Sequence, residues 1–165
     1  MKFTTEQQLQ NEITKGLIVA VTYTVKKIKE ENTDVINQDV YGVYSPSWYE
    51  RTMDFLNAWD TETSGGGGHV EGEMYYEPGY IGVGDSESGQ HVSVVDGSSQ
   101  AQNMPELLYQ AGMGCIQRPT NRDAWKSLDS ILSNSAIRQI FEDGLSLSGM
   151  DWKRKTGAIT VSKSR

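Results

Sequence analysis

Lysine and arginine are missing from the middle of this chain. No cation stands between Arg51 and Arg118. The same interval carries ten acidic residues: Asp54, Asp60, Glu62, Glu71, Glu73, Glu77, Asp85, Glu87, Asp96 and Glu106. A block of one sign this long gives a surface potential of one sign, which governs encounter and repulsion more than folding. An acidic, soluble protein with a solvated surface and a frayed basic tail explains the same pattern.

Cysteine and long apolar runs are also scarce. The single cysteine, Cys115, excludes an internal disulfide and a multi-cysteine zinc site. The longest apolar run is Leu17 to Val21, far short of the roughly 20 residues that span a bilayer. The first six residues lack the layout of a signal peptide. We therefore expect a protein without a membrane partner, made and used in the cytoplasm.

The last fourteen residues reverse the charge. They hold no acid, and their aromatic and basic residues are Trp152, Lys153, Arg154, Lys155, Lys163 and Arg165. We predict a single domain over residues 1–151 and a flexible basic tail or arm over 152–165. Such a tail suits the phosphates of a nucleic acid, with Trp152 stacking on a base, and it suits the acidic face of a neighbouring subunit equally well.

Helical periodicity opens the chain. Thr4 and Thr5 precede Gln7 and Gln8 at the spacing of a capping box. Apolar residues then recur along one helical face: Leu9, Ile13, Leu17, Val21, Val25 and Ile28. The sequence predicts a long helix that ends at Lys26, Lys27 and Lys29, where cations suit the helix dipole. Its apolar face fits an ordinary core contact or a subunit contact.

In the middle of the chain, alternation of apolar and polar residues replaces the helical periodicity. Residues 53–61 and 70–77 alternate as strands do, and the second strand has a wet acidic face. The four glycines 65–68 predict a hairpin connection, and Pro78-Gly79 predicts a turn. Residues 80–83 and 90–95 are shorter strand candidates.

The C-terminal third returns to helices. We expect them over 106–112, over 123–132 with Asn121 as the cap, and over 136–143 with Ser135 as the cap and Gly144 as the stop. The whole layout predicts an α+β fold: a long N-terminal helix, an antiparallel β-sheet with glycine-rich loops, and C-terminal helices.

Chemistry-bearing residues are few. His69, Glu71 and Glu73 share one strand face, and His91 is a conceivable fourth metal ligand. Adjacent glycines would fix such a site poorly, so a solvated acidic strand is the favoured interpretation. Nothing nearby tunes the paired carboxylates for acid–base work. We expect no catalytic residue, no bound metal and no cofactor, and hence no enzyme.

Two segments carry a resemblance to a known family. The first is Val40-Tyr41-Gly42-Val43-Tyr44-Ser45-Pro46-Ser47-Trp48-Tyr49-Glu50-Arg51-Thr52-Met53-Asp54-Phe55-Leu56. It is similar to a YSP-x-x-YERT-x-x-LL stretch in small structural proteins of phages that infect Gram-positive bacteria. The second is Arg118-Pro119-Thr120-Asn121-Arg122-Asp123-Ala124-Trp125, followed by Ile137 to Gly144. It resembles the C-terminal part of the same proteins, where a similar start opens the closing helices. The order of elements is similar too. The chain thus resembles the tail-completion, or minor capsid and neck (head–tail joining), family of long-tailed bacteriophages.

The resemblance implies a structural role in the virion, after assembly in the host cytoplasm. Such proteins form homo-oligomeric rings around the DNA channel and contact other neck, portal or tail proteins, while DNA passes without sequence-specific binding. Glu71, Glu73 and Glu77 would then face the channel, and the 152–165 arm would contact the next subunit. Two alternatives stay open, a tail terminator or other tail structural protein and a small DNA-binding or packaging accessory protein.

Overall fold

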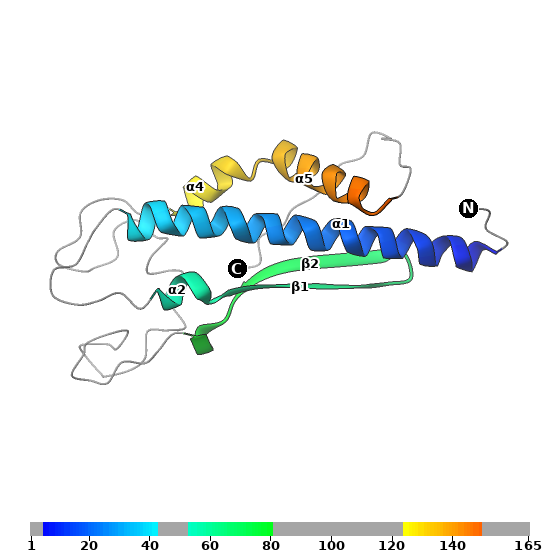
Figure 1. The fold of residues 1–165 in the computed structure, drawn as a ribbon, viewed down its shortest axis with the longest axis horizontal. Coiled ribbons are helices and arrows are strands. Elements are labelled where there is room, and N and C mark those ends of the chain that lie inside the picture. The colour runs from blue at the N-terminus through cyan, green and yellow to red at the C-terminus, as the bar shows by residue number, and fades with distance from the viewer. Residues whose placement is uncertain (1–4, 43–52, 81–123, 150–165) are drawn as a thin grey trace. The chain divides into compact units, whose positions relative to one another are not determined.

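The computed structural model describes residues 5–42, 53–80 and 124–149 (Figure 1). These residues form α1 (Glu6–Val35), the π-helix η1 (Ile36–Tyr41), α2 (Asp54–Asn57), β1 (Trp59–Gly66), β2 (His69–Tyr76), the 3-10 helix η2 (Pro78–Tyr80), α4 (Ala124–Ile131) and α5 (Asn134–Leu147). The predicted α+β class is confirmed: a long N-terminal helix, a two-stranded antiparallel sheet and C-terminal helices. The domain boundary at residue 151 stays a prediction.

Chain contacts divide the protein into two compact units. Among the described residues, the first unit holds 5–29, 61–74 and 131–149, and the second holds 30–42, 53–60, 75–80 and 124–130.

The N-terminal helix begins where the sequence predicts and ends later. Thr5 Oγ1 accepts a hydrogen bond from the backbone N–H of Gln8 at 3.2 Å, which caps the first turn. The predicted end at Lys29 is wrong, because α1 continues to Val35 and into η1. No glycine or proline follows until Gly42, and the buried residues Asn32, Val35 and Ile36 continue the helical spacing.

Within the first unit α1 is packed on two sides rather than along one apolar face. A Cβ added to Gly144 of α5 would lie 2.9 Å from Ala20 Cα, and one added to Gly72 of β2 would lie 2.5 Å from Val21 Cγ1. The small residues therefore let a helix and a hairpin approach α1 closely (Figure 1). Leu9 and Ile13, predicted on the packed face, remain 41% and 39% exposed.

The two strands form a hairpin with a two-residue turn. Gly67 and Gly68 have φ values of +61° and +87°, the positive pair that a type I′ turn requires. Just outside the two strands, the N–H of Glu77 donates a hydrogen bond to the carbonyl of Ala58 at 2.7 Å. This pair continues the strand pairing that the two-residue turn sets. The predicted hairpin connection over 65–68 is confirmed, although Gly65 and Gly66 belong to β1.

The strand predicted over 53–61 is wrong in its first half. Residues 54–57 form the short helix α2, and β1 begins only at Trp59. Phe55, Ala58 and Trp59 are buried at the i, i+3, i+4 spacing of a helical turn, which overrides the alternation of the sequence.

Three aromatic rings gather in the second unit. Phe55 and Trp59 meet edge to face with ring centroids 5.9 Å apart, and Tyr76 lies 5.8 Å from Phe55 and 5.5 Å from Trp59. Burial raises the pKa of Tyr76 from 10.0 to about 12, since the charged phenolate would lose its hydration. Among the described residues of this unit, the other buried apolar residues are Val35, Ile36, Val40, Ala58 and Leu128.

The helices predicted over 123–132 and 136–143 both exist, but they begin and end at other residues than predicted. Helix α4 covers most of the predicted 123–132. Helix α5 is capped by Ser133 rather than Ser135, since Ser133 Oγ accepts from the N–H of Ala136 at 3.3 Å. Gly144 lies inside α5, and Gly149, with φ +71°, follows its end as a left-handed glycine.

The remaining predicted elements lie outside the described residues. They are the strands over 80–83 and 90–95, apart from Tyr80 at the end of η2, the helix over 106–112 and the Asn121 cap. Among the helices that the structure describes, none is long and apolar enough to cross a bilayer.

A candidate acidic surface on the hairpin

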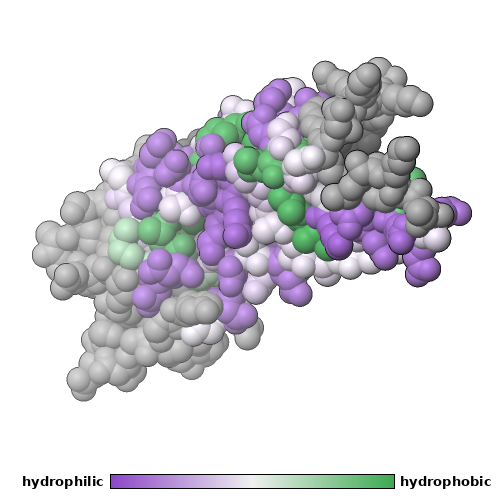
Figure 2. All heavy atoms as spheres, turned by 45° about the vertical axis from the view of Figure 1, so that its right-hand side comes forward, coloured by the Kyte–Doolittle hydropathy of each residue, from purple (hydrophilic) through white to green (hydrophobic). Residues whose placement is uncertain are grey.

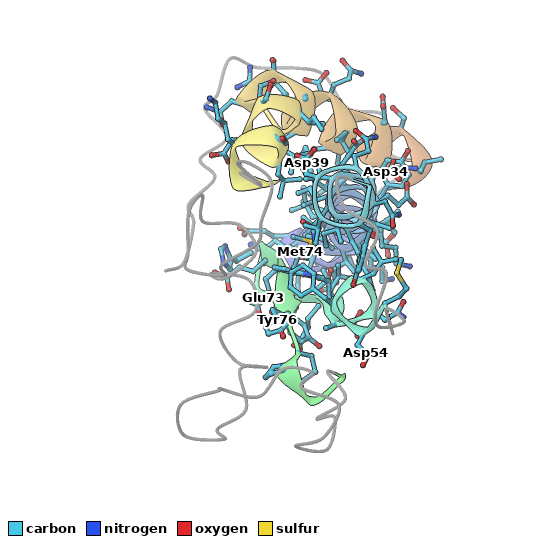
Figure 3. The ribbon with its side chains drawn as sticks, turned by 90° about the vertical axis from the view of Figure 1, so that its left-hand side faces the viewer. Asp34, Asp39, Asp54, Glu73, Met74 and Tyr76 are labelled. Carbon is cyan, nitrogen blue, oxygen red and sulfur yellow. The ribbon has the colours of Figure 1, made fainter. Side chains whose placement is uncertain are left out.

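The hairpin presents two different faces within the first unit. Alternate residues of a strand point to opposite sides, so Thr63, Gly72 and Met74 share the face that packs on α1. Glu62, Glu71 and Glu73 share the other face and are exposed. Figure 3 shows Met74 on the α1 side of β2 and Glu73 on the opposite side. The wet acidic face predicted for the second strand is confirmed.

The register of the hairpin concentrates charge on this face. A two-residue turn at Gly67 and Gly68 places Glu62 directly opposite Glu73, and Ser64 opposite Glu71. Like charges directly opposite each other on neighbouring strands are destabilising. We call Glu62, Glu71 and Glu73 the hairpin acidic face. All three side chains of this face are exposed.

His69 precedes Glu71 by two residues on β2 and shares its face of the strand. Its Nε2 lies 2.8 Å from Glu71 Oε1, and both side chains are mostly exposed. An exposed pair of this kind contributes little to stability. Among the described residues, no three His, Cys, Asp or Glu side chains gather closely enough to hold a metal ion, and His91 lies outside them. The arrangement around His69 therefore offers one carboxylate and not a ligand set.

Of the other predicted site residues, the structure describes Glu77 alone. Glu77 follows β2 in the second unit, is exposed, and accepts from the N–H of Gly79 through Oε1 at 3.3 Å. Its described role is to cap the Pro78–Tyr80 turn. The residues of the basic arm, Trp152, Lys153, Arg154, Lys155, Lys163 and Arg165, lie outside the described residues.

Sequence reasoning missed one member of the face. Glu62 was only one of ten acids in the interval, with no role of its own. The signal that identifies it is the pair Gly67-Gly68: read as a two-residue turn, it fixes which residues of the two strands stand opposite each other.

Comparison with known proteins places this small α+β chain in a family. A sequence model of the family YomN matches residues 5–157, and the chain therefore belongs to the YomN family. The family name is of the SPbeta-prophage type, which indicates a phage origin. No curated protein matches the chain, and no solved structure does.

Proposed function

We propose that this protein is a structural component of a phage virion that acts in head–tail joining or tail completion. It assembles with copies of itself into a neck or connector ring around the DNA channel and performs no catalytic turnover. The hairpin acidic face is the observation that carries the proposal, because it is an exposed hairpin face whose three carboxylates have one charge. The phage origin of the family supports the setting.

The physical role of the face follows from the charge of DNA. Duplex DNA carries one negative charge per roughly 1.7 Å of axis, so any cationic wall would hold it. Each subunit of a ring would contribute Glu62, Glu71 and Glu73 to the wall of the channel. Exposed charges act over about 8 Å at physiological salt, enough to keep a passing duplex from adhering. Glu77 extends the same role if the second unit also approaches the channel.

The basic arm supplies the complementary contact in this proposal. Trp152, Lys153, Arg154, Lys155, Lys163 and Arg165 would reach an adjacent subunit or an acidic surface of a portal, neck or tail protein. Head-to-tail contacts of this kind close into a ring when the rotation between subunits closes. The ring would assemble in the host cytoplasm and remain in the virion.

Electron microscopy of a lysate from phage lacking this gene tests the proposal. Filled heads lying apart from finished tails are the expected result. Intact particles, or a complete lack of capsids, would contradict a joining role. Tails of abnormal length still attached to heads would instead indicate a tail terminator, the nearest alternative within the same class.

A second candidate function rests on the cationic tail alone. Five cations without an acid fit a small DNA-binding or packaging accessory protein. Salt-sensitive DNA binding by the purified protein that disappears when 152–165 are deleted would favour this alternative. Phage assembly unaffected by the same deletion would argue against an arm in the ring.

A further inference from the structure

The outer edge of β2 has no strand beside it among the described residues. The sheet that these residues form consists of β1 and β2, so β2 has one edge on β1 and one edge away from it (Figure 1). A strand edge presents a row of backbone N–H and C=O groups with which a strand of another molecule can pair. Native proteins limit such pairing with charged side chains on the edge strand. The side chains of β2 therefore decide which strands this edge accepts.

The hydrogen-bonding pattern of the hairpin determines which backbone groups of β2 point outward. The two-residue turn 67–68 makes Gly66 and His69 a hydrogen-bonded pair. Every second residue from His69 onward then bonds to β1, and Glu77, which donates to the carbonyl of Ala58 at 2.7 Å, fits this series. The residues between them direct their N–H and C=O groups away from β1. Within β2 these residues include Val70, Gly72 and Met74.

Pairing this edge with β2 of a second copy would bring like charges together. In an antiparallel pair, outward-bonding residues stand opposite each other, and the residues between them form the closer non-hydrogen-bonded pairs, with Cα atoms about 4.5 Å apart. Glu71 and Glu73 belong to the closer pairs. When Gly72 stands opposite Gly72 of the second copy, each Glu71 faces a Glu73. When Gly72 stands opposite Met74, the two Glu73 residues face each other. Like charges directly opposite each other are destabilising, so both registers are disfavoured.

We propose that Glu71 and Glu73 prevent the outer edge of β2 from pairing with β2 of a second copy. Both side chains are exposed, and Glu73 lies on the side of β2 away from α1 (Figure 3). This role concerns the edge of the strand, whereas the proposed role in a DNA channel concerns its face. It also acts on the single subunit, before any ring forms. Contact between copies is then left to surfaces other than this edge.

Mixing two proteins that carry opposite charge on β2 tests the proposal. The variant E71K/E73K repels itself, but its lysines stand opposite the glutamates of the wild type in a joined sheet. The mixture should therefore form a 1:1 species that neither protein forms alone. We expect this species at a protein concentration about tenfold lower than any association of the separate proteins through β2, because repulsion is replaced by attraction. Sedimentation equilibrium at low salt measures it.

The matched control places the same charge change elsewhere. Hydrophilic side chains are spread over the described surface (Figure 2), and Glu6 of α1 and Asp143 of α5 are both exposed. The variants E6K/D143K and E71K/E73K each change the formal net charge from −7 to −3, because two acids become two lysines. A mixture of E6K/D143K with the wild type should contain no new 1:1 species.

Hydrogen exchange locates the contact. The outward amides of Val70, Gly72 and Met74 should exchange more slowly in the mixture of E71K/E73K with the wild type than in either protein alone, because they become bonded in the joined sheet. Association without this protection, equal association by both lysine variants, or no association would overturn the proposal.

A charge-neutral pair decides if E71K/E73K does not fold. We expect E71Q/E73Q to self-associate at a concentration about 2- to 30-fold lower than the wild type, since two repulsive pairs are removed. E6Q/D143N, with the same net charge, should associate like the wild type. Equal self-association of the two neutral variants would show that Glu71 and Glu73 do not protect the edge.

Discussion

At the scale of single residues, two glycines set how closely α1 is packed, and Gly72 gives the cleaner test. A Cβ at this position would lie 2.5 Å from Val21 Cγ1 and 2.8 Å from Val25 Cγ1. We expect Gly72→Ala to lower the free energy of unfolding by about 1–3 kcal/mol through overpacking. Gly66→Ala, with nothing within 4 Å of the added Cβ, is the control and should change stability by less than about 0.5 kcal/mol. Urea denaturation measures both, and equal midpoints would contradict the close approach.

At Gly144 the two atoms closest to an added Cβ are backbone atoms. An added Cβ would lie 2.9 Å from both Cα and O of Ala20. Alanine favours a helix over glycine by about 1 kcal/mol, so a freely exposed glycine would gain stability on replacement. We expect Gly144→Ala to lose about 1–3 kcal/mol instead, since neither backbone can yield without opening the helix pair. A rise in melting temperature would show that α5 and α1 are not in contact here.

Tyr76 links stability to alkaline pH. Burial raises the pKa of Tyr76 to about 12, above its ordinary value of 10.0. The unfolded chain therefore releases the phenolic proton first, and the folded state loses stability as the pH rises from 10 towards 12. Below pH 10 the contribution is fully present. We expect Tyr76→Phe to weaken this alkaline loss, measured by urea unfolding over that range. An identical pH slope in the two proteins would place the phenol in water.

At the scale of elements, the N-cap of α5 is Ser133 and not Ser135. Ser133 Oγ accepts from the N–H of Ala136 at 3.3 Å and lies 3.0 Å from Ser135 Oγ. We expect Ser133→Ala to cost about 1 kcal/mol, the usual loss for an N-cap. Ser135→Ala, at the cap position expected from the sequence, should cost less. Helix content and thermal unfolding compare the pair; a larger loss at Ser135 would move the start of α5.

The sequence predicted the types of the described elements better than their ends. The Thr5 cap and the acidic face of β2 follow from local rules that need no tertiary information. The end of α1 and the stop at Gly144 were wrong because lysines and glycines have local preferences that packing overrides. Gly144 is needed where α5 meets Ala20, and no pattern along the chain reports that contact.

Residues 54–57 show the same limit. Their alternation fits a strand, yet Phe55, Ala58 and Trp59 are buried together in a helical turn beside Tyr76. Tertiary burial of large aromatic rings outweighs a short alternating pattern. For the candidate site, the carboxylates of Glu71 and Glu73 were predictable from strand alternation. Their juxtaposition with Glu62 required the register of the hairpin.

At the scale of the whole molecule, the effect of where the acidic residues lie can be separated from the effect of the net charge. The triple variant E62Q/E71Q/E73Q changes the formal net charge from −7 to −4, since three carboxylates are neutralised. The triple variant E6Q/D34N/D143N makes the same change with acids of α1 and α5. Any property that depends on net charge alone should respond equally to both variants.

DNA association distinguishes the two. If the hairpin acidic face repels phosphates locally, E62Q/E71Q/E73Q should bind duplex DNA more tightly than the control triple in a gel-shift assay at low salt, because the three carboxylates that repel phosphates at this surface are gone. The difference should vanish as salt shortens the screening length. The same variant should be about 0.2–1 kcal/mol more stable, because the Glu62–Glu73 repulsion is gone. Equal DNA binding by the two triples would mean that total charge sets the repulsion, and the hairpin acidic face would then have no special place in a DNA channel.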